Sequence, residues 1–230
     1  MKKTLILFSL LLSFSLYSQN VEKNSKVYFN LKAGVSIPLG DFSKGILDTG
    51  GFADPGFYAG FDAVWMVYDR IGITVSSDLA MNPIRVSELG YERMQVDPFL
   101  IDLWVRSDPF KLISSYGGLT YRSELFDRIN INTGISLGMM YGETPYQILY
   151  SEYFMVGTNY YIITSAGSYG FAYKLDANIE YELRKQWSVF ANFGYQHSKL
   201  RFKFYSGSGD RFENKKIDLL NIAFGIRLKL

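Results

Sequence analysis

The chain offers few side chains with the reactivity that catalysis needs. It has one histidine, His197, followed directly by Ser198, and no cysteine. Histidine with serine and a carboxylate can form a hydrolase or acyl-transferase site, but alternation along a strand turns His197 and Ser198 to opposite faces. Because the chain has a single histidine and no cysteine, it has no histidines or cysteines at the spacing of a metal site. We therefore predict no catalytic residue, no cofactor and no metal site. If the strand that carries His197 crosses a membrane, we interpret His197 as an outward-facing residue of the aromatic belt near the extracellular rim.

A second chemical feature is a set of charged side chains that alternate with apolar ones. They are Lys32, Asp62, Asp78, Arg122, Glu124, Lys174, Asp176, Glu180, Arg227 and Lys229. Acids and bases are in near balance, so these side chains could line a pore or neutralise one another. If the alternating segments are eight strands that close into a barrel, its interior is only wide enough for side chains to fill. A charge buried there needs a partner of opposite charge. We predict a plug of salt bridges, with an ion channel as the alternative.

Strands with two unlike faces must position these charges. Every second residue is apolar from Val27 to Ile37, from Phe57 to Val67 and from Leu220 to Leu230, which is the period of a β-strand. Five further segments alternate in the same way, and Ile113–Phe126 is the weakest. A soluble β-sandwich would alternate too. The length of the segments, their aromatic ends and their polar faces of glycine and mixed charge favour a transmembrane barrel.

The connections between the strands predict the topology. The sequences "VYDRIGI", "LFDRINI" and "LRKQWSV" begin at equal intervals, at positions 67, 125 and 183. Asp69-Arg70, Asp127-Arg128 and Arg184–Gln186 read as turns of two or three residues, and long connections alternate with them, at about 39–56, 82–112, 142–168 and 201–216. We predict an all-β fold: an eight-stranded antiparallel up-and-down transmembrane β-barrel with short periplasmic turns and long extracellular loops.

The first residues predict export. Residues 1–18, "MKKTLILFSLLLSFSLYS", combine two lysines with a short apolar run, which is typical of a signal peptide. We expect cleavage near Ser18/Gln19, a short segment over 19–26 and the barrel over 27–230; an N-terminal membrane anchor is the alternative. Lys2 and Lys3 supply the whole net charge of +2, so bulk charge predicts no nucleic-acid partner.

Two segments carry a family resemblance. "FNLKAGVSIPLGDFS" (Phe29–Ser43) and "NIAFGIRLKL" (Asn221–Leu230) resemble the first and last strands of the small outer-membrane β-barrel family, which includes OmpA-like and OmpX-like domains. The resemblance implies an outer-membrane location, contact with membrane lipid, and recognition of the last strand by the barrel-assembly machinery. The usual terminal aromatic residue is replaced by Leu230.

The long connections are the most promising functional surface. Trp104 lies within 82–112, and 142–168 is dense in tyrosine; exposed aromatic patches often mark interaction sites. The alternative is that these connections extend the hairpins and pack on each other. We predict a non-enzymatic barrel with a structural role, or one that presents these loops to an extracellular or envelope partner. A small transporter or pore for apolar or small solutes is the second hypothesis, and a lipid-modifying barrel enzyme is the third.

Overall fold

The computed structural model describes residues 27–47, 49–154, 156–184, 186–206 and 209–230. The predicted signal peptide and the segment 19–26 lie outside the described residues. Within the described part of the chain, no helix is long and apolar enough to cross a membrane.

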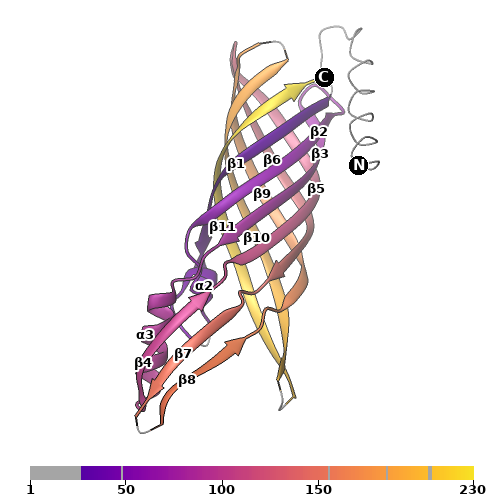
Figure 1. Ribbon diagram of the computed structural model, residues 1–230. Coiled ribbons are helices and arrows are strands. Elements are labelled where there is room, and N and C mark those ends of the chain that lie inside the picture. The colour runs from indigo at the N-terminus through magenta and orange to yellow at the C-terminus, as the bar shows by residue number, and fades with distance from the viewer. Residues whose placement is uncertain (1–26, 48, 155, 185, 207–208) are drawn as a thin grey trace, which may run out of the picture.

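Eight long antiparallel strands close into a barrel (Figure 1). In chain order they are β1 (Val27–Leu39), β2 (Gly56–Met66), β3 (Ile71–Asn82), β5 (Phe110–Phe126), β6 (Ile129–Glu143), β9 (Gly167–Glu182), β10 (Trp187–Ser206) and β11 (Gly209–Lys229). Each strand pairs with the barrel strands before and after it in the chain. The first and last strands pair from Tyr28–Lys229 to Leu39–Asp218, which confirms the up-and-down barrel.

The two faces of the barrel wall are the reverse of those in a soluble protein. On β1, Leu31 is 60% exposed on the outside, whereas Lys32 beside it is buried in the lumen. The same alternation gives an outer belt of exposed apolar side chains on all eight strands, and aromatic residues such as Trp65 and Tyr169 lie near its two ends. Such a belt is stable against hydrocarbon and unfavourable in water.

The three short turns lie together at one end of the barrel, the short-turn end. The turn between β5 and β6 consists of residues 127–128, as predicted. The turns at 67–70 and 183–186 have four residues each, which is longer than the predicted two or three. At the first of these turns the backbone N–H groups of Val67 and Tyr68 both donate to the Ile71 carbonyl at 3.0 Å. Strand pairing therefore stops before Asp69, because the chain has already begun to reverse.

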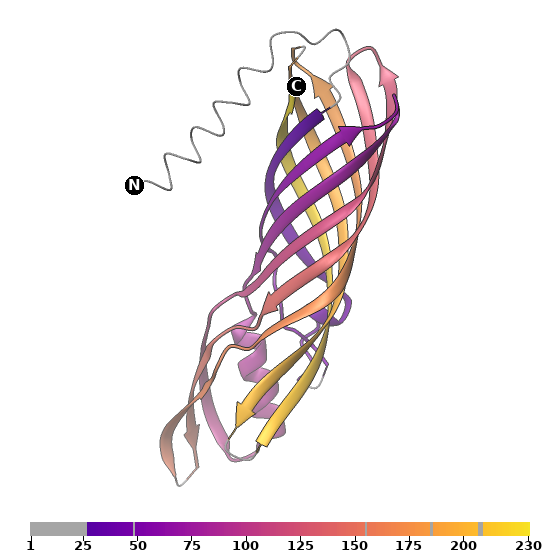
Figure 2. The same ribbon diagram turned by 90° about the vertical axis from the view of Figure 1, so that its right-hand side faces the viewer.

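At the opposite end, the long-loop end, the chain builds a second structure. Three strands, β4 (Leu100–Ser107), β7 (Gln147–Tyr153) and β8 (Gly157–Ile163), form a separate sheet, and the helix α3 (Val86–Val96) lies against it. A single helical turn, α2 (Gly40–Ser43), sits between this sheet and the barrel mouth (Figures 1 and 2).

The fourth long connection differs from its prediction. Instead of a loop over 201–216, β10 and β11 remain paired up to Ser206 and Gly209. This hairpin projects beyond the ring at the long-loop end (Figure 1). Alternation continues through the segment, so the strands extend until the chain reverses.

Closure of the ring can be tested at Gly34. A Cβ at Gly34 would lie 2.0 Å from the Ile222 carbonyl oxygen across the β1–β11 seam, whereas a Cβ at Gly117 would meet nothing within 4 Å. We expect Gly34→Ala to lower the free energy of unfolding by about 1–3 kcal/mol, because the backbone must move. Gly117→Ala is the control. Urea unfolding followed by heat-dependent gel migration measures both, and equal stability of the two variants would contradict the seam geometry.

Candidate functional site

The middle of the lumen holds a buried network of charges. Lys32 Nζ lies 2.9 Å from Asp62, and Lys174 Nζ lies 2.8 Å from Asp78. Lys174 also approaches Asp176 at 3.5 Å and Asp62 at 3.7 Å. Burial of these charges is tolerable only because each faces an opposite charge. Two lysines and three carboxylates therefore act as one network.

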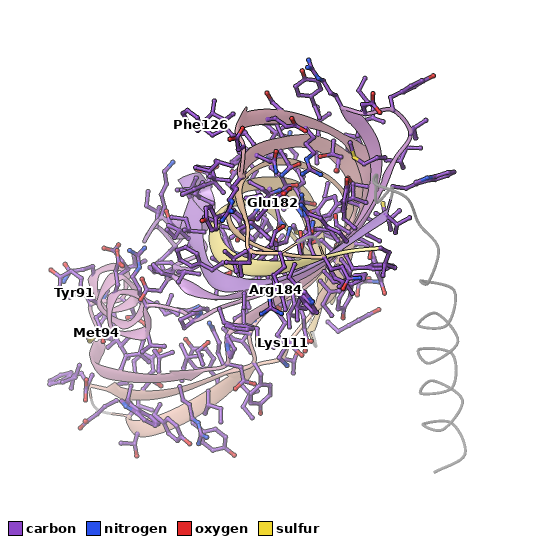
Figure 3. All side chains as sticks on the ribbon, turned by 90° about the horizontal axis from the view of Figure 1, so that it is seen from above. Tyr91, Met94, Lys111, Phe126, Glu182 and Arg184 are labelled. Atoms are coloured by element: carbon purple, nitrogen blue, oxygen red, sulfur yellow. The ribbon has the colours of Figure 1, made fainter. Side chains whose placement is uncertain are left out.

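A second network fills the lumen nearer the short-turn end. Glu180 accepts from Arg227 and lies 3.1 Å from Lys229. Glu182 accepts from Lys229 and, at 2.9 Å, from Arg122. Seen along the barrel, Glu182 lies inside the ring (Figure 3). This network has three cations and two carboxylates, so its excess charge is opposite to that of the middle network.

The predicted set of inward charges needs one correction. Nine of the ten predicted residues belong to the two networks, but Glu124 is exposed. Glu124 still pairs in register with the buried Asn130, but it lies two residues from the end of β5, where its side chain is exposed. Glu182, which the prediction did not include, occupies the lumen and completes the balance of five cations and five carboxylates.

Little open space remains between the two networks. A cavity of about 20 Å³ lies there, lined by residues that include Asn30, Thr74 and Arg227. That volume holds roughly one water molecule. The networks therefore fill the lumen as a plug in this region, as the charge balance predicted.

The mouth at the long-loop end is closed in a different way, by apolar side chains. Fully buried inward-facing residues meet there, namely Leu112, Met140, Leu200, Phe202 and Leu219. Phe42 of α2, only 1% exposed, belongs to the same core, and its ring centre lies 5.0 Å from that of Phe110. We call this group the apolar stopper. The sequence alone did not predict this group, although Leu200 and Phe202 have the same inward direction along β10 as Ser198.

His197 faces outward, as predicted, but it has a partner that the sequence did not suggest. Its Nδ1 lies 2.7 Å from Asp218 Oδ1, which also accepts from the Tyr195 hydroxyl at 2.6 Å. Ser198 points the other way and donates to the Phe171 carbonyl at 2.9 Å. Ser198 therefore does not join the histidine and the carboxylate in one site. Among the described residues, no group of three or more potential ligands could hold a metal ion.

The separate sheet presents a row of aromatic side chains. Trp104, Tyr150 and Tyr160 are register partners across β4, β7 and β8. The ring centres are 5.2 Å apart for Trp104 and Tyr150, and 6.3 Å apart for Tyr150 and Tyr160. All three remain exposed, at 59%, 45% and 63%. We call these three residues the aromatic row.

The opposite face of this sheet is covered. Leu103, Val105 and Leu149 are buried against Leu89 of α3 and Phe52 of the first long connection. The two loops therefore pair with each other, as one of the predicted alternatives states, and one aromatic face of the sheet stays exposed. Figure 3 places Tyr91 and Met94 of α3 to the side of the barrel ring, with the helix next to the separate sheet.

Hydrogen bonds tie the end of β3 to neighbouring parts of the chain at the long-loop end. The Asn82 side-chain amide donates to the Ser36 carbonyl at 3.1 Å and to the Asp54 carbonyl at 3.0 Å. The Arg85 backbone N–H donates to the Phe52 carbonyl at 2.9 Å. These bonds join the end of β3 to β1 and to the first long connection, so they fix the direction in which the chain leaves the barrel.

A closed ring with an apolar outer belt and a neutralised polar lumen defines a transmembrane β-barrel. Among solved structures, the chain is similar to neisserial surface protein A, with 13% identity, a TM-score of 0.54, and coverage of 91% of this chain and 100% of that one. It is also similar to a major outer membrane protein from Thermus thermophilus, with 10% identity, a TM-score of 0.52, and coverage of 89% and 99%. At such identity the likeness concerns the fold alone. No protein-family model and no curated protein matches the chain.

The middle charge network predicts a large effect of removing Lys174. Lys174→Met leaves Asp78 and Asp176 with much less compensating charge, so we expect a loss of roughly 3–5 kcal/mol in the free energy of unfolding. The control is Lys111→Met, because Lys111 lies 3.9 Å from Glu143 at an exposed site, where a pair contributes about 1 kcal/mol or less. Equilibrium unfolding in lipid vesicles measures both, and similar losses would contradict a lumen held by its ion pairs.

Proposed function

We propose that this protein is a non-enzymatic recognition barrel of the outer membrane, which presents its separate sheet to an extracellular macromolecule. The observation that carries the proposal is the aromatic row, three aligned and exposed rings on a sheet whose other face is already covered. Exposure of three aromatic rings to water is unfavourable for the isolated protein. A patch of this kind often marks an interaction site, where a partner buries the apolar area of the rings.

The composition of the open face supports recognition by a macromolecule. Tryptophan, tyrosine and arginine are the residues that most often carry binding energy at interfaces. Two register rows flank the aromatic row: Asp102 and Glu152 on one side, and Arg106 with Ile148 on the other. An aromatic centre with acidic and basic margins gives a partner both apolar area and charge complementarity.

The lumen supports the same proposal over the transporter hypothesis. The ion-pair plug and the apolar stopper lie in series between the short-turn end and the long-loop end. A solute would have to break buried salt bridges and displace the stopper to pass. For the lipid-modifying enzyme hypothesis, the described residues show Ser198 directed to the Phe171 carbonyl, away from the His197–Asp218 pair.

The orientation follows the rule for such barrels that long loops face outward and short turns face the periplasm. On this reading the aromatic row lies outside the cell. Residues 1–18 as a signal peptide and the last strand as the segment read by the assembly machinery remain part of the proposal, since they rest on the sequence.

Two aromatic substitutions test the recognition surface. A panel of extracellular proteins and glycans is first screened for binding to the barrel in lipid nanodiscs, which identifies a ligand. The affinity of that ligand is then measured for the unaltered chain and for the double variant Trp104→Ala with Tyr150→Ala. We expect the affinity to fall roughly 30-fold or more, because central aromatic residues dominate interfaces.

The matched control is Tyr205→Ala on the β10–β11 hairpin, where Tyr205 is also exposed at the long-loop end. Loss of affinity in that variant alone, or full affinity in the double variant, would place recognition elsewhere. Heat-dependent gel migration confirms that each variant is folded.

A further inference from the structure

A group of cations lies on the outer wall where β10 and β11 leave the apolar belt. Lys199 and Lys216 are register partners on the outward face, and Arg201 follows one row farther from the belt. Lys44 joins them from the end of α2 through Asp41, whose carboxylate accepts from Lys44 at 2.7 Å and from Lys216 at 3.4 Å. We call Lys44, Lys199, Arg201 and Lys216 the cationic patch.

The protein compensates the charges of this patch only in part. Within the described part of the chain, neither Lys199 nor Arg201 has an acidic partner. Asp41 is shared by two lysines, and those hydrogen bonds, the one from Lys44 above all, hold the pKa of its carboxyl below the usual value. Asp218, in the next row, is the other nearby carboxylate. Cations therefore exceed carboxylates by two.

A pair of like charges directly opposite each other destabilises a sheet. At a comparable height on another part of the wall, the register partners have opposite charges: Lys111 faces Glu143 across β5 and β6. Lys111 stands one row beyond the belt residue Tyr141, just as Lys199 stands one row beyond His197. The contrast indicates that the Lys199–Lys216 pair serves something other than stability of the isolated wall.

The height of the patch indicates what could neutralise it. The row directly below it is His197 with Asp218, and below that row the outward residues of the two strands are apolar or aromatic, namely Tyr195, Phe193, Leu220 and Ile222. The patch is two residues farther along the strand than His197, a step of roughly 5 Å along the axis of a tilted strand. That is the level at which acyl chains give way to charged head groups.

We propose that the cationic patch binds the phosphate group of a lipid in the outer leaflet, with the lipid's acyl chains against the apolar wall below. When the oxygen atoms of the phosphate group bind between Lys199 and Lys216, charge-assisted hydrogen bonds replace the repulsion between the two lysines. Arg201 is already positioned, because its guanidinium stacks on the Phe212 ring at 4.3 Å. The inference shares with the proposed function only the placement of the long-loop end in the outer leaflet, and it does not depend on the aromatic row.

Native mass spectrometry in detergent tests the site with diphosphorylated lipid A and with the same lipid after removal of its phosphates. We expect the phosphorylated lipid to bind preferentially. Lys199→Gln with Lys216→Gln should weaken it about 25-fold, from a factor of about five for each cation at an anionic surface. The matched control, Lys111→Gln, should leave binding unchanged. Equal binding of the dephosphorylated lipid, an unaffected double variant or an equal loss in the control would each overturn the proposal.

Two further measurements distinguish a lipid site from a soluble-anion site and from a purely structural pair of lysines. Inorganic phosphate at the same concentration should not displace the lipid; if it does, the site is for a soluble anion and the proposal fails. Unfolding in urea without lipid should leave the double variant at least as stable as the unaltered chain, because a repulsion has been removed, whereas added lipid A should reverse that order. A double variant that is less stable without lipid would assign the two lysines a structural role instead.

Discussion

The requirement that every backbone N–H and C=O group be paired inside the hydrocarbon region governs this structure. The chain meets it with the seam between β1 and β11, which runs from Tyr28–Lys229 to Leu39–Asp218 and leaves no open edge in the ring. Closing eight strands makes the lumen narrow, so the small residue Gly34 is needed where the seam backbones approach. A narrow lumen in turn forces each inward charge next to another.

The lumen then divides into two kinds of interior. Where the wall is surrounded by lipid, the interior is ionic, and Lys174 and Glu180 are completely buried among opposite charges. Toward the long-loop end it becomes apolar, and Phe42 and Phe202 pack as in a soluble core. This stopper supports the base of the separate sheet, because the first long connection contributes Phe42 to the stopper and Phe52 to the core of the sheet. Rigid loops at one end thus depend on a filled lumen.

Much of the barrel could be predicted because its cause is local. A period of two residues encodes which side chains face lipid, so the strands, nine inward charges and the outward direction of His197 followed from the sequence. Glu124 differs from the prediction because it lies near the end of β5, where a residue in register with the buried Asn130 is nevertheless exposed. The separate sheet could not be predicted, since Trp104 and Tyr150 meet only after two loops distant in the chain come together. The partnership of His197 with Asp218 likewise depends on the register between β10 and β11, which no single strand encodes.

We infer that the barrel is a closed wall around a filled interior and that it acts through its outer surface and its long-loop end. Conductance of the purified protein in planar lipid bilayers tests this most directly. We expect no reproducible single-channel steps, because the ion-pair networks and the apolar stopper block the lumen in series. Regular unitary steps that persist across preparations and follow the salt concentration would contradict it.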